Sequence, residues 1–246
     1  MTVEITGVEG IEEIAPGTDI AALIADASRD RPLVDGDVVV VTHKIVSKSE
    51  GQLVDLRTIT PSALAVRIAE QFGKDARQVD VVLRESARIV RMERGIIICE
   101  TRHGLICANA GVDASNVAKE TVCLLPRDPD ASAARIRAGL RERTGADVAV
   151  IISDSFGRPW RNGIINIAIG VAGMLPLADY RGQTDPAGYD LRVTVMAVAD
   201  ELAGAAELVM GKVDMVPVAV ICGYTYNRGD GTGHDLVMDP AKDLFR

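Results

Sequence analysis

The chain of 246 residues is 48% hydrophobic and 25% charged, a balance typical of globular domains large enough to bury a sizeable core. Its formal net charge of −8 argues against broad non-specific binding to DNA, RNA or anionic membranes. Aromatic residues make up 3% of the chain, so we expect an aliphatic core and no aromatic platform for stacking nucleic-acid bases.

The first elements in chain order are short and alternate in type. An apolar run at 3–8 predicts a strand, residues 18–28 predict a helix, and VVVVT at 38–42 predicts a buried strand. The polar segment that follows, residues 43–51, is interpreted as a loop or an edge strand. Thr60-Pro61 suits the N-cap and first position of a helix that runs to Gly73.

The rest of the chain mixes strands and helices without strict alternation. The predicted elements are a helix at 76–86, strands at 88–92, 95–100 and 104–108, a helix at 130–144 stopped by Gly145, a strand at 148–152, an apolar stretch at 164–171, a loop-rich region at 175–189, a helix at 194–210, a strand at 216–222 and a glycine-rich loop at 223–235. No repeat or linker divides the chain. The sequence therefore predicts an α+β fold with mixed sheets, as one domain over residues 1–246 or as two interleaved subdomains.

The cysteines and the N-terminus indicate the cellular compartment. Cys99, Cys107, Cys123 and Cys222 lie in apolar segments, and no pair has zinc-type or C-x-x-C spacing, so reduced buried thiols are predicted. The opening MTVEITGVEG lacks the pattern of a signal peptide, and no apolar run approaches the ~20 residues of a membrane span. We therefore expect a cytoplasmic protein that does not bind membranes.

Two aspartates have the local pattern of metal ligands. Asp113 in NAGVDASN and Asp154 in SDSFG each follow a predicted buried strand, in a loop rich in small polar residues. Mg²⁺ prefers one or two carboxylates together with waters and phosphate oxygens. Aspartates in such segments also form Asx turns or cap helices. The residues alone leave both interpretations open.

Basic residues lie close to these segments. Arg158 and Arg161 follow Asp154 in GRPWRNG, and a guanidinium group suits phosphate or carboxylate binding. Lys44 and Lys48 follow the predicted strand at 38–42, where they could clamp a phosphate. A solvated loop is the alternative for the two arginines.

Several stretches together resemble one protein family, the coenzyme F420-0:γ-glutamyl ligases. In order they are VEGI, IVSKSEG, NAGVDASN, SDSFGRPWRNG, AIGVAG, VADELA with AELVMGK, and PVAVICG, and they span nearly the whole chain. The resemblance implies a homodimer with an unusual α+β fold of two intimately connected lobes. It also implies a reaction in which GTP and Mg²⁺ or Mn²⁺ serve to join L-glutamate to coenzyme F420-0 by an amide bond, with further γ-glutamyl additions as an option.

Site residues follow from the resemblance position by position. Asp113 and Asp154 are expected to bind a divalent metal ion, and Ser155 is expected to contact a second one. The implied reaction, through an acyl phosphate, also needs fixed positive charge, and from their chemistry we expect Lys48, Arg158 and Arg161 to supply it. Nucleotide contacts are implied for Ile11, Glu12, Glu13, Ile14, His43, Lys44, Lys48, Asn116, Met210, Gly211 and Lys212.

The sequence departs from the family pattern at one metal position. Where some members carry an acidic residue that ligates the second metal, this chain has Lys212. An ammonium group cannot ligate a metal, although it could sit on a phosphate, and Asp214 could substitute as the ligand. Two alternatives stay open, a GTP-dependent ligase for another carboxylate acceptor and a non-catalytic nucleotide-binding relative. Some relatives carry a fused C-terminal flavin-type domain, which we do not expect in a chain that ends at Arg246.

Overall fold

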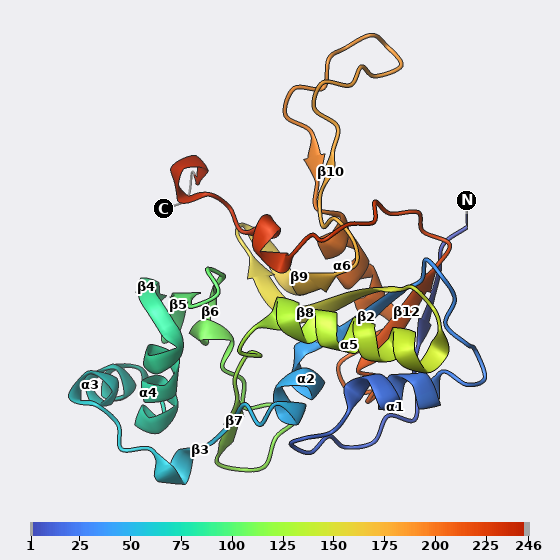
Figure 1. Ribbon diagram of the computed structural model, residues 1–246. Coiled ribbons are helices and arrows are strands. Elements are labelled where there is room, and N and C mark those ends of the chain that lie inside the picture. The colour runs from blue at the N-terminus through green and yellow to red at the C-terminus, as the bar shows by residue number, and fades with distance from the viewer. Residues whose placement is uncertain (1, 244–246) are drawn as a thin grey trace.

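The computed structural model describes residues 2–243 and is built around a five-stranded sheet with the order β1-β12-β2-β8-β9 (Figure 1). Its strands are β1 (Glu4–Gly7), β2 (Val38–Thr42), β8 (Ala149–Arg158), β9 (Arg161–Ala172) and β12 (Val218–Cys222). Strands β2 and β8 run parallel, whereas the other neighbouring pairs in this sheet are antiparallel. The predicted α+β fold with a mixed sheet is therefore confirmed.

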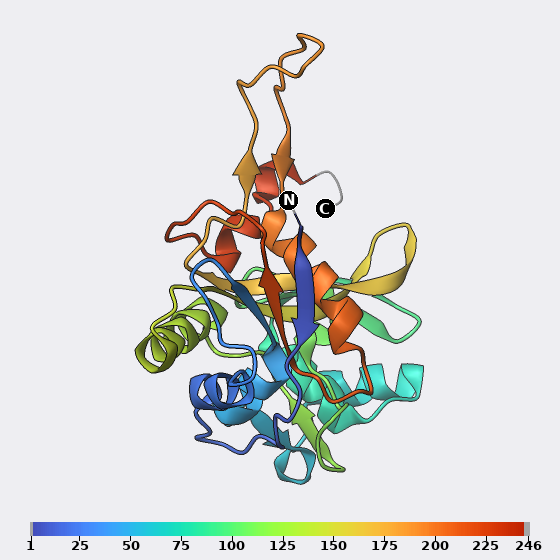
Figure 2. The ribbon, with the colours of Figure 1, turned by 90° about the vertical axis from the view of Figure 1, so that its right-hand side faces the viewer.

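Helices cover both faces of this sheet. On one face lie α1 (Ile20–Ala27) and α5 (Pro129–Thr144), and on the other lies α6 (Val198–Met210) (Figure 2). Because successive side chains of a strand point to opposite faces, Val39 and Val41 of β2 join the first layer and Val38 and Val40 join the second. This explains why the whole VVVV run is apolar.

Residues 53–123 form a second lobe, which lies between β2 and β8 in the sequence and beside the main sheet in space (Figure 1). It has its own core, built from helices and short sheets. Its elements are β3 (Leu53–Asp55), η1 (Leu56–Thr58), α3 (Ala63–Phe72), α4 (Ala76–Glu85), β4 (Ser86–Glu93), β5 (Ile96–Thr101), β6 (Ile106–Ala108), η2 (Asn109–Gly111) and β7 (Thr121–Cys123). The main sheet is thus built from the segments before and after this lobe in the sequence.

The remaining elements are short. They are α2 (His43–Ser49), β10 (Ala178–Asp179), β11 (Val195–Met196), η3 (Gly233–Leu236) and η4 (Pro240–Lys242). Strands β10 and β11 begin and end a long arm that projects from the body of the protein in both views (Figures 1 and 2). Among residues 2–243 no helix is long and apolar enough to cross a membrane. The expected absence of a domain beyond Arg246 lies outside the described residues.

Three predictions at helices were wrong. Residues 43–49 form helix α2 rather than a loop or an edge strand. Helix α3 is capped by Ser62, whose hydroxyl accepts a hydrogen bond from the Ala65 N–H at 3.3 Å, so Thr60-Pro61 lies outside the helix. The predicted helix from residue 194 begins only at Val198, because Val195 and Met196 pair with β10.

Strand β8 is longer than predicted, and it carries the segment that was expected to be a loop. It runs on through Asp154 to Arg158, paired with β9 along the way. The predicted cysteine state agrees with the structure, since all four thiols are free and only Cys222 is partly exposed.

We predict that Gly170→Ala destabilises the protein by about 1–3 kcal/mol, a cost typical of overpacking. A Cβ atom at Gly170 in β9 would lie 2.5 Å from the backbone carbonyl group of Pro129, where α5 begins. Gly157→Ala in the same hairpin is the matched control, because its Cβ would meet nothing within 4 Å. Urea unfolding of both variants measures the difference. Equal stabilities would contradict the close approach of α5 to β9.

Candidate functional site

The candidate site lies where two parallel strands end. Thr42 at the end of β2 pairs with Ser153 of β8, so the residues that follow them reach the same edge of the sheet. His43 and Lys44 open α2 directly after β2, and Asp154 follows Ser153 along β8. A cavity of about 420 Å³ opens at this edge, between α2, β8 and the C-terminal end of α6. Its position follows the general tendency of α/β sheets to bind ligands beyond the carboxyl ends of their parallel strands.

The cavity gathers most of the residues that the sequence predicted to contact a nucleotide. Of that set, only His43 does not line it, because this side chain is buried beneath the cavity. The lining residues are Ile11, Glu12, Glu13, Ile14, Lys44, Lys48, Asn116, Met210, Gly211 and Lys212. Segments from the first, middle and last parts of the chain therefore meet here.

The helical form of α2 places two lysines on one face. Lys44 and Lys48 are one helical turn apart, so both can reach the cavity. The Lys48 residue is 7% exposed, and its ammonium forms an ion pair with Glu13, whose side chain is 72% exposed. Glu13 is the one ion-pair partner of Lys48 among the described residues, and an anionic ligand in the cavity could replace it.

Lys44 connects α2 to Asp113. Its Nζ lies 2.7 Å from Asp113 Oδ2 and donates a hydrogen bond of 2.8 Å to Ser115 Oγ. The Ser115 N–H also donates to Asp113 Oδ1 at 2.7 Å, so Asp113 does form the turn that the sequence left as one alternative. Burial opposes ionisation of Asp113, but the Lys44 and Ser115 hydrogen bonds outweigh it and lower the pKa of this carboxyl group. Asp113 is therefore charged at neutral pH.

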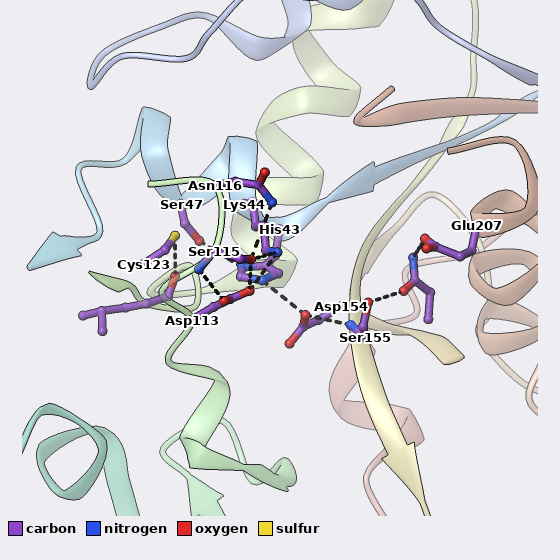
Figure 3. Close-up of polar contacts among 12 residues, drawn as sticks. His43, Lys44, Ser47, Asp113, Ser115, Asn116, Cys123, Asp154, Ser155 and Glu207 are labelled. Atoms are coloured by element: carbon purple, nitrogen blue, oxygen red, sulfur yellow. Dashed lines mark hydrogen bonds and ion pairs between the residues drawn. The ribbon is translucent and has the colours of Figure 1, made fainter. Parts of the chain in front are cut away.

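Asp154 projects from β8 toward His43. Its Oδ1 accepts a hydrogen bond of 2.7 Å from the Ser155 N–H and lies 3.2 Å from His43 Nε2. His43 is 1% exposed, its Nδ1 lies 3.3 Å from Ser47 Oγ, and its Nε2 has no hydrogen-bond partner among the described residues. Figure 3 shows the Asp113 and Asp154 carboxyl groups beside the first turn of α2.

Two carboxylates, Asp113 and Asp154, could hold a metal ion that takes its other ligands from a substrate. Among the described residues, no three His, Cys, Asp or Glu side chains are grouped so that they could hold an ion by themselves. Mg²⁺ typically takes one or two carboxylates and completes its shell with waters and phosphate oxygens. Asp113 and Asp154 match that kind of site rather than an all-protein cage.

A second polar group lines the cavity opposite α2, and the sequence reasoning missed two of its members. Asn166 and Glu207 join Ser155 and Lys212 there. Ser155 Oγ donates to Asn166 Oδ1 at 2.6 Å, and Asn166 Nδ2 donates to Glu207 Oε2 (Figure 3). Two signals could have found them: Asn166 interrupts the apolar run IINIAI, and Glu207 interrupts the apolar end of the AELVM helix.

Five predicted site residues do not line this cavity: His43, Asp113, Arg158, Arg161 and Asp214. Arg158 and Arg161 lie at the turn between β8 and β9, and Arg158 Nη2 donates to the carbonyl of Asn162 at 2.9 Å. The Asp214 side chain packs against Gly211. A Cβ atom added at Gly211 would lie only 2.1 Å from Asp214 Oδ2.

Comparisons with known proteins agree with the sequence resemblance. Residues 10–223 match the model of a family described as F420-0:Gamma-glutamyl ligase. A protein named coenzyme F420:L-glutamate ligase from Methanothermobacter thermautotrophicus is 47% identical, with both chains covered in full. Proteins of the same name from Methanopyrus kandleri and Methanocaldococcus jannaschii are each 45% identical; the alignments cover 95% and 87% of this chain, and 94% and 86% of theirs.

Proposed function

This chain belongs to the F420-0:γ-glutamyl ligase family, and from that premise we infer that it joins L-glutamate to coenzyme F420-0 by an amide bond, using GTP. The reaction needs a divalent ion, Mg²⁺ or Mn²⁺, and it takes place in the cytoplasm. Beyond the names of the relatives, one observation carries this proposal: three lysines line a single cavity together with Asp154, and one of them, Lys44, also contacts Asp113, in a chain whose net charge is −8.

The cavity has a polar and an apolar part, as a nucleotide requires. Lys44, Lys48 and Lys212 supply positive charge for a triphosphate. Ile11, Ile14 and several other apolar side chains supply walls for the base and ribose. The further apolar lining residues are Ile45, Val213, Met215, Val216 and Pro217. Local positive charge is essential here, because the overall field of an acidic protein repels GTP.

Asp113 and Asp154 are the residues that would hold the divalent ion. When bound, the ion neutralises negative charge on the phosphoryl oxygens of the nucleotide. His43 packs behind Asp154 and limits the directions in which that carboxylate can turn. Lys44 holds Asp113 in its charged form and in place.

The chemistry needs an activated carboxyl group, because a carboxylate is a poor acyl donor. In the proposed sequence a terminal carboxylate oxygen of F420-0 attacks the γ-phosphorus of GTP, and GDP leaves with the electron pair of the broken P–O bond. The amine of glutamate, after losing a proton to solvent, then attacks the acyl carbon of the resulting acyl phosphate. Phosphate leaves and the amide forms. The protein positions the reactants and stabilises charge, so no side chain has to act as a nucleophile.

Product analysis tests this function. Incubation with F420-0, L-glutamate, GTP and Mn²⁺ should give F420-0 extended by glutamate, with GDP formed in step. Release of GDP with a different carboxylate acceptor but not with F420-0 would indicate another ligase, and GTP binding without turnover would indicate a non-catalytic relative. F420-0 labelled with ¹⁸O in its carboxylate should pass one label into phosphate; unlabelled phosphate would reject the acyl phosphate.

We also propose that the protein is a homodimer and that the projecting arm takes part in the contact. Tyr189 is 72% exposed and Val193 is 87% exposed on this projecting arm, where a second chain could bury both side chains (Figure 2). Light scattering coupled to gel filtration should give twice the chain mass for the wild type. The Tyr189→Ser/Val193→Ser variant should dissociate more readily; a monomeric wild type would contradict the proposal.

A further inference from the structure

Lys212 occupies an oxygen-lined position at the polar end of the cavity. Its Nζ lies 2.5 Å from Glu207 Oε1, 2.7 Å from Ser155 Oγ and 3.4 Å from Asn166 Oδ1. These three oxygens come from α6, β8 and β9, so they belong to rigid elements rather than to the loop that carries Lys212. An ammonium group has three donors, and the group of oxygens offers it three acceptors.

Hydrogen bonds among Ser155, Asn166 and Glu207 themselves orient the oxygens that Lys212 contacts. Asn166 is 4% exposed, and its amide NH₂ group donates to Glu207, which directs its carbonyl oxygen toward Ser155 and Lys212. Ser155 donates its own proton to that Asn166 oxygen, so its remaining lone pairs face the Lys212 ammonium. A carboxylate, an amide oxygen and a hydroxyl are the oxygen types that bind hard cations.

Gly211 sets the direction of the Lys212 side chain. Its φ of 61° and ψ of −169° lie in a region that is essentially restricted to glycine, and they end α6 with a sharp turn. This turn brings the next residue back over the end of α6, where the chain meets Ser155 and Glu207. The backbone is thus arranged so that residue 212 contributes its side chain to the cavity.

We propose that the ammonium group of Lys212 is the resident cation at this end of the cavity, and that the protein consequently binds one divalent ion, at Asp113 and Asp154, instead of two. The proposal rests on the proposed nucleotide site. It implies that Lys212 brings a fixed charge to the phosphates without any metal at that position. Asp214, which folds against Gly211, takes no part in metal binding.

The simpler reading is a surface ion pair between Lys212 and Glu207 near the C-terminal end of a helix. Such pairs contribute little, and the Lys212 side chain is 52% exposed. The two readings differ in what happens when the lysine becomes an acid. On our proposal, Lys212→Glu adds a carboxylate to a ready set of oxygen ligands and creates a second metal site. On the surface-pair reading it only places two carboxylates side by side.

The test counts Mn²⁺ bound per chain by equilibrium dialysis and metal analysis, with saturating GDP, and needs no catalysis. The wild type should retain one Mn²⁺ per chain and Lys212→Glu should retain two, with the spin-coupled electron paramagnetic resonance signal of a close Mn²⁺ pair. Lys242→Glu makes the same charge change outside the cavity and should retain one. Thermal unfolding confirms that each variant is folded.

Two Mn²⁺ ions in the wild type, or only one in folded Lys212→Glu, would overturn the proposal. GDP retention is measured in the same samples. No GDP binding by the wild type would overturn both the nucleotide site and the role of Lys212, whereas GDP bound together with two Mn²⁺ ions would overturn only the latter.

Discussion

Asp154→Asn should lower ligase turnover by at least about 10²-fold at limiting Mn²⁺ while leaving the protein folded, because the loss of one fixed interaction with developing charge has an effect of this order. The substitution removes a charge from the metal position but keeps the volume of the side chain, which is mostly buried between His43 and the cavity. The His43 ring keeps a polar neighbour. Turnover is measured as GDP release that depends on both F420-0 and glutamate.

Asp113→Asn should have a similar effect for a related reason. Its carboxylate is held ionised by Lys44 and Ser115, so the amide would lose both the metal contact and the ion pair. Asp230→Asn, an exposed carboxylate outside the cavity, is the control and should behave as the wild type. Excess Mn²⁺ should restore part of the activity of either site variant. Wild-type turnover by Asp113→Asn or Asp154→Asn at limiting Mn²⁺ would show that the metal assignment is wrong.

Lys48→Met should weaken GTP binding by about 10²-fold, or ~2.7 kcal/mol, because it removes a buried positive charge and keeps the aliphatic stem. The buried position of Lys48 shields its charge from solvent screening. The unfolding temperature should change little, since the partner left behind, Glu13, is exposed to solvent. Calorimetric titration with GTP measures the change.

Glu13→Gln separates two roles for Lys48. If the lysine serves the nucleotide, neutralising Glu13 should leave GTP affinity unchanged or improve it, because the phosphate no longer competes with a carboxylate. If Lys48 instead only anchors the segment that carries Glu13, then Lys48→Met and Glu13→Gln should weaken GTP binding equally. That second pattern would remove Lys48 from the proposed phosphate site.

Local sequence patterns predicted an element correctly where they reflected how the segment is buried in the fold. The VVVVT run of β2 was predicted at its observed bounds because an unbroken β-branched run suits a strand buried on both faces. Helix α2 was missed for the opposite reason. HKIVSKS has β-branched and hydroxyl residues, and Thr42 makes no side-chain cap, so its helical form depends on tertiary packing of Ile45 and Val46.

Many residues of the site could be predicted from the sequence, but the way in which the fold brings them together could not. Asp113 and Asp154 carry a local signal, yet nothing in the sequence places the turn after β6 beside the end of β8; the pairing of β2 with β8 and the Lys44 contact do that. Asn166 was missed because its partner Ser155 is set by the register of β8 and β9, which sequence periodicity does not specify.

The expected position of Asp154 in a loop also failed for a physical reason. Its segment, SDSFG, is rich in the small polar residues of loops, but each residue has a ladder partner in β9, and this pairing extends the strand. A carboxylate on a strand is held more rigidly than one on a loop. That rigidity suits a group that has to position a metal ion against a phosphate.

A crystal structure with GDP and Mn²⁺ bound would show where this protein holds the nucleotide and the metal ion. We expect the phosphates of GDP against Lys44 and Lys48, with one Mn²⁺ in contact with Asp113 and Asp154 and the Lys212 ammonium still in contact with Ser155 and Glu207. A nucleotide bound elsewhere, for example in the cavity lined by His103 and His234, or Mn²⁺ that contacts neither aspartate, would contradict it.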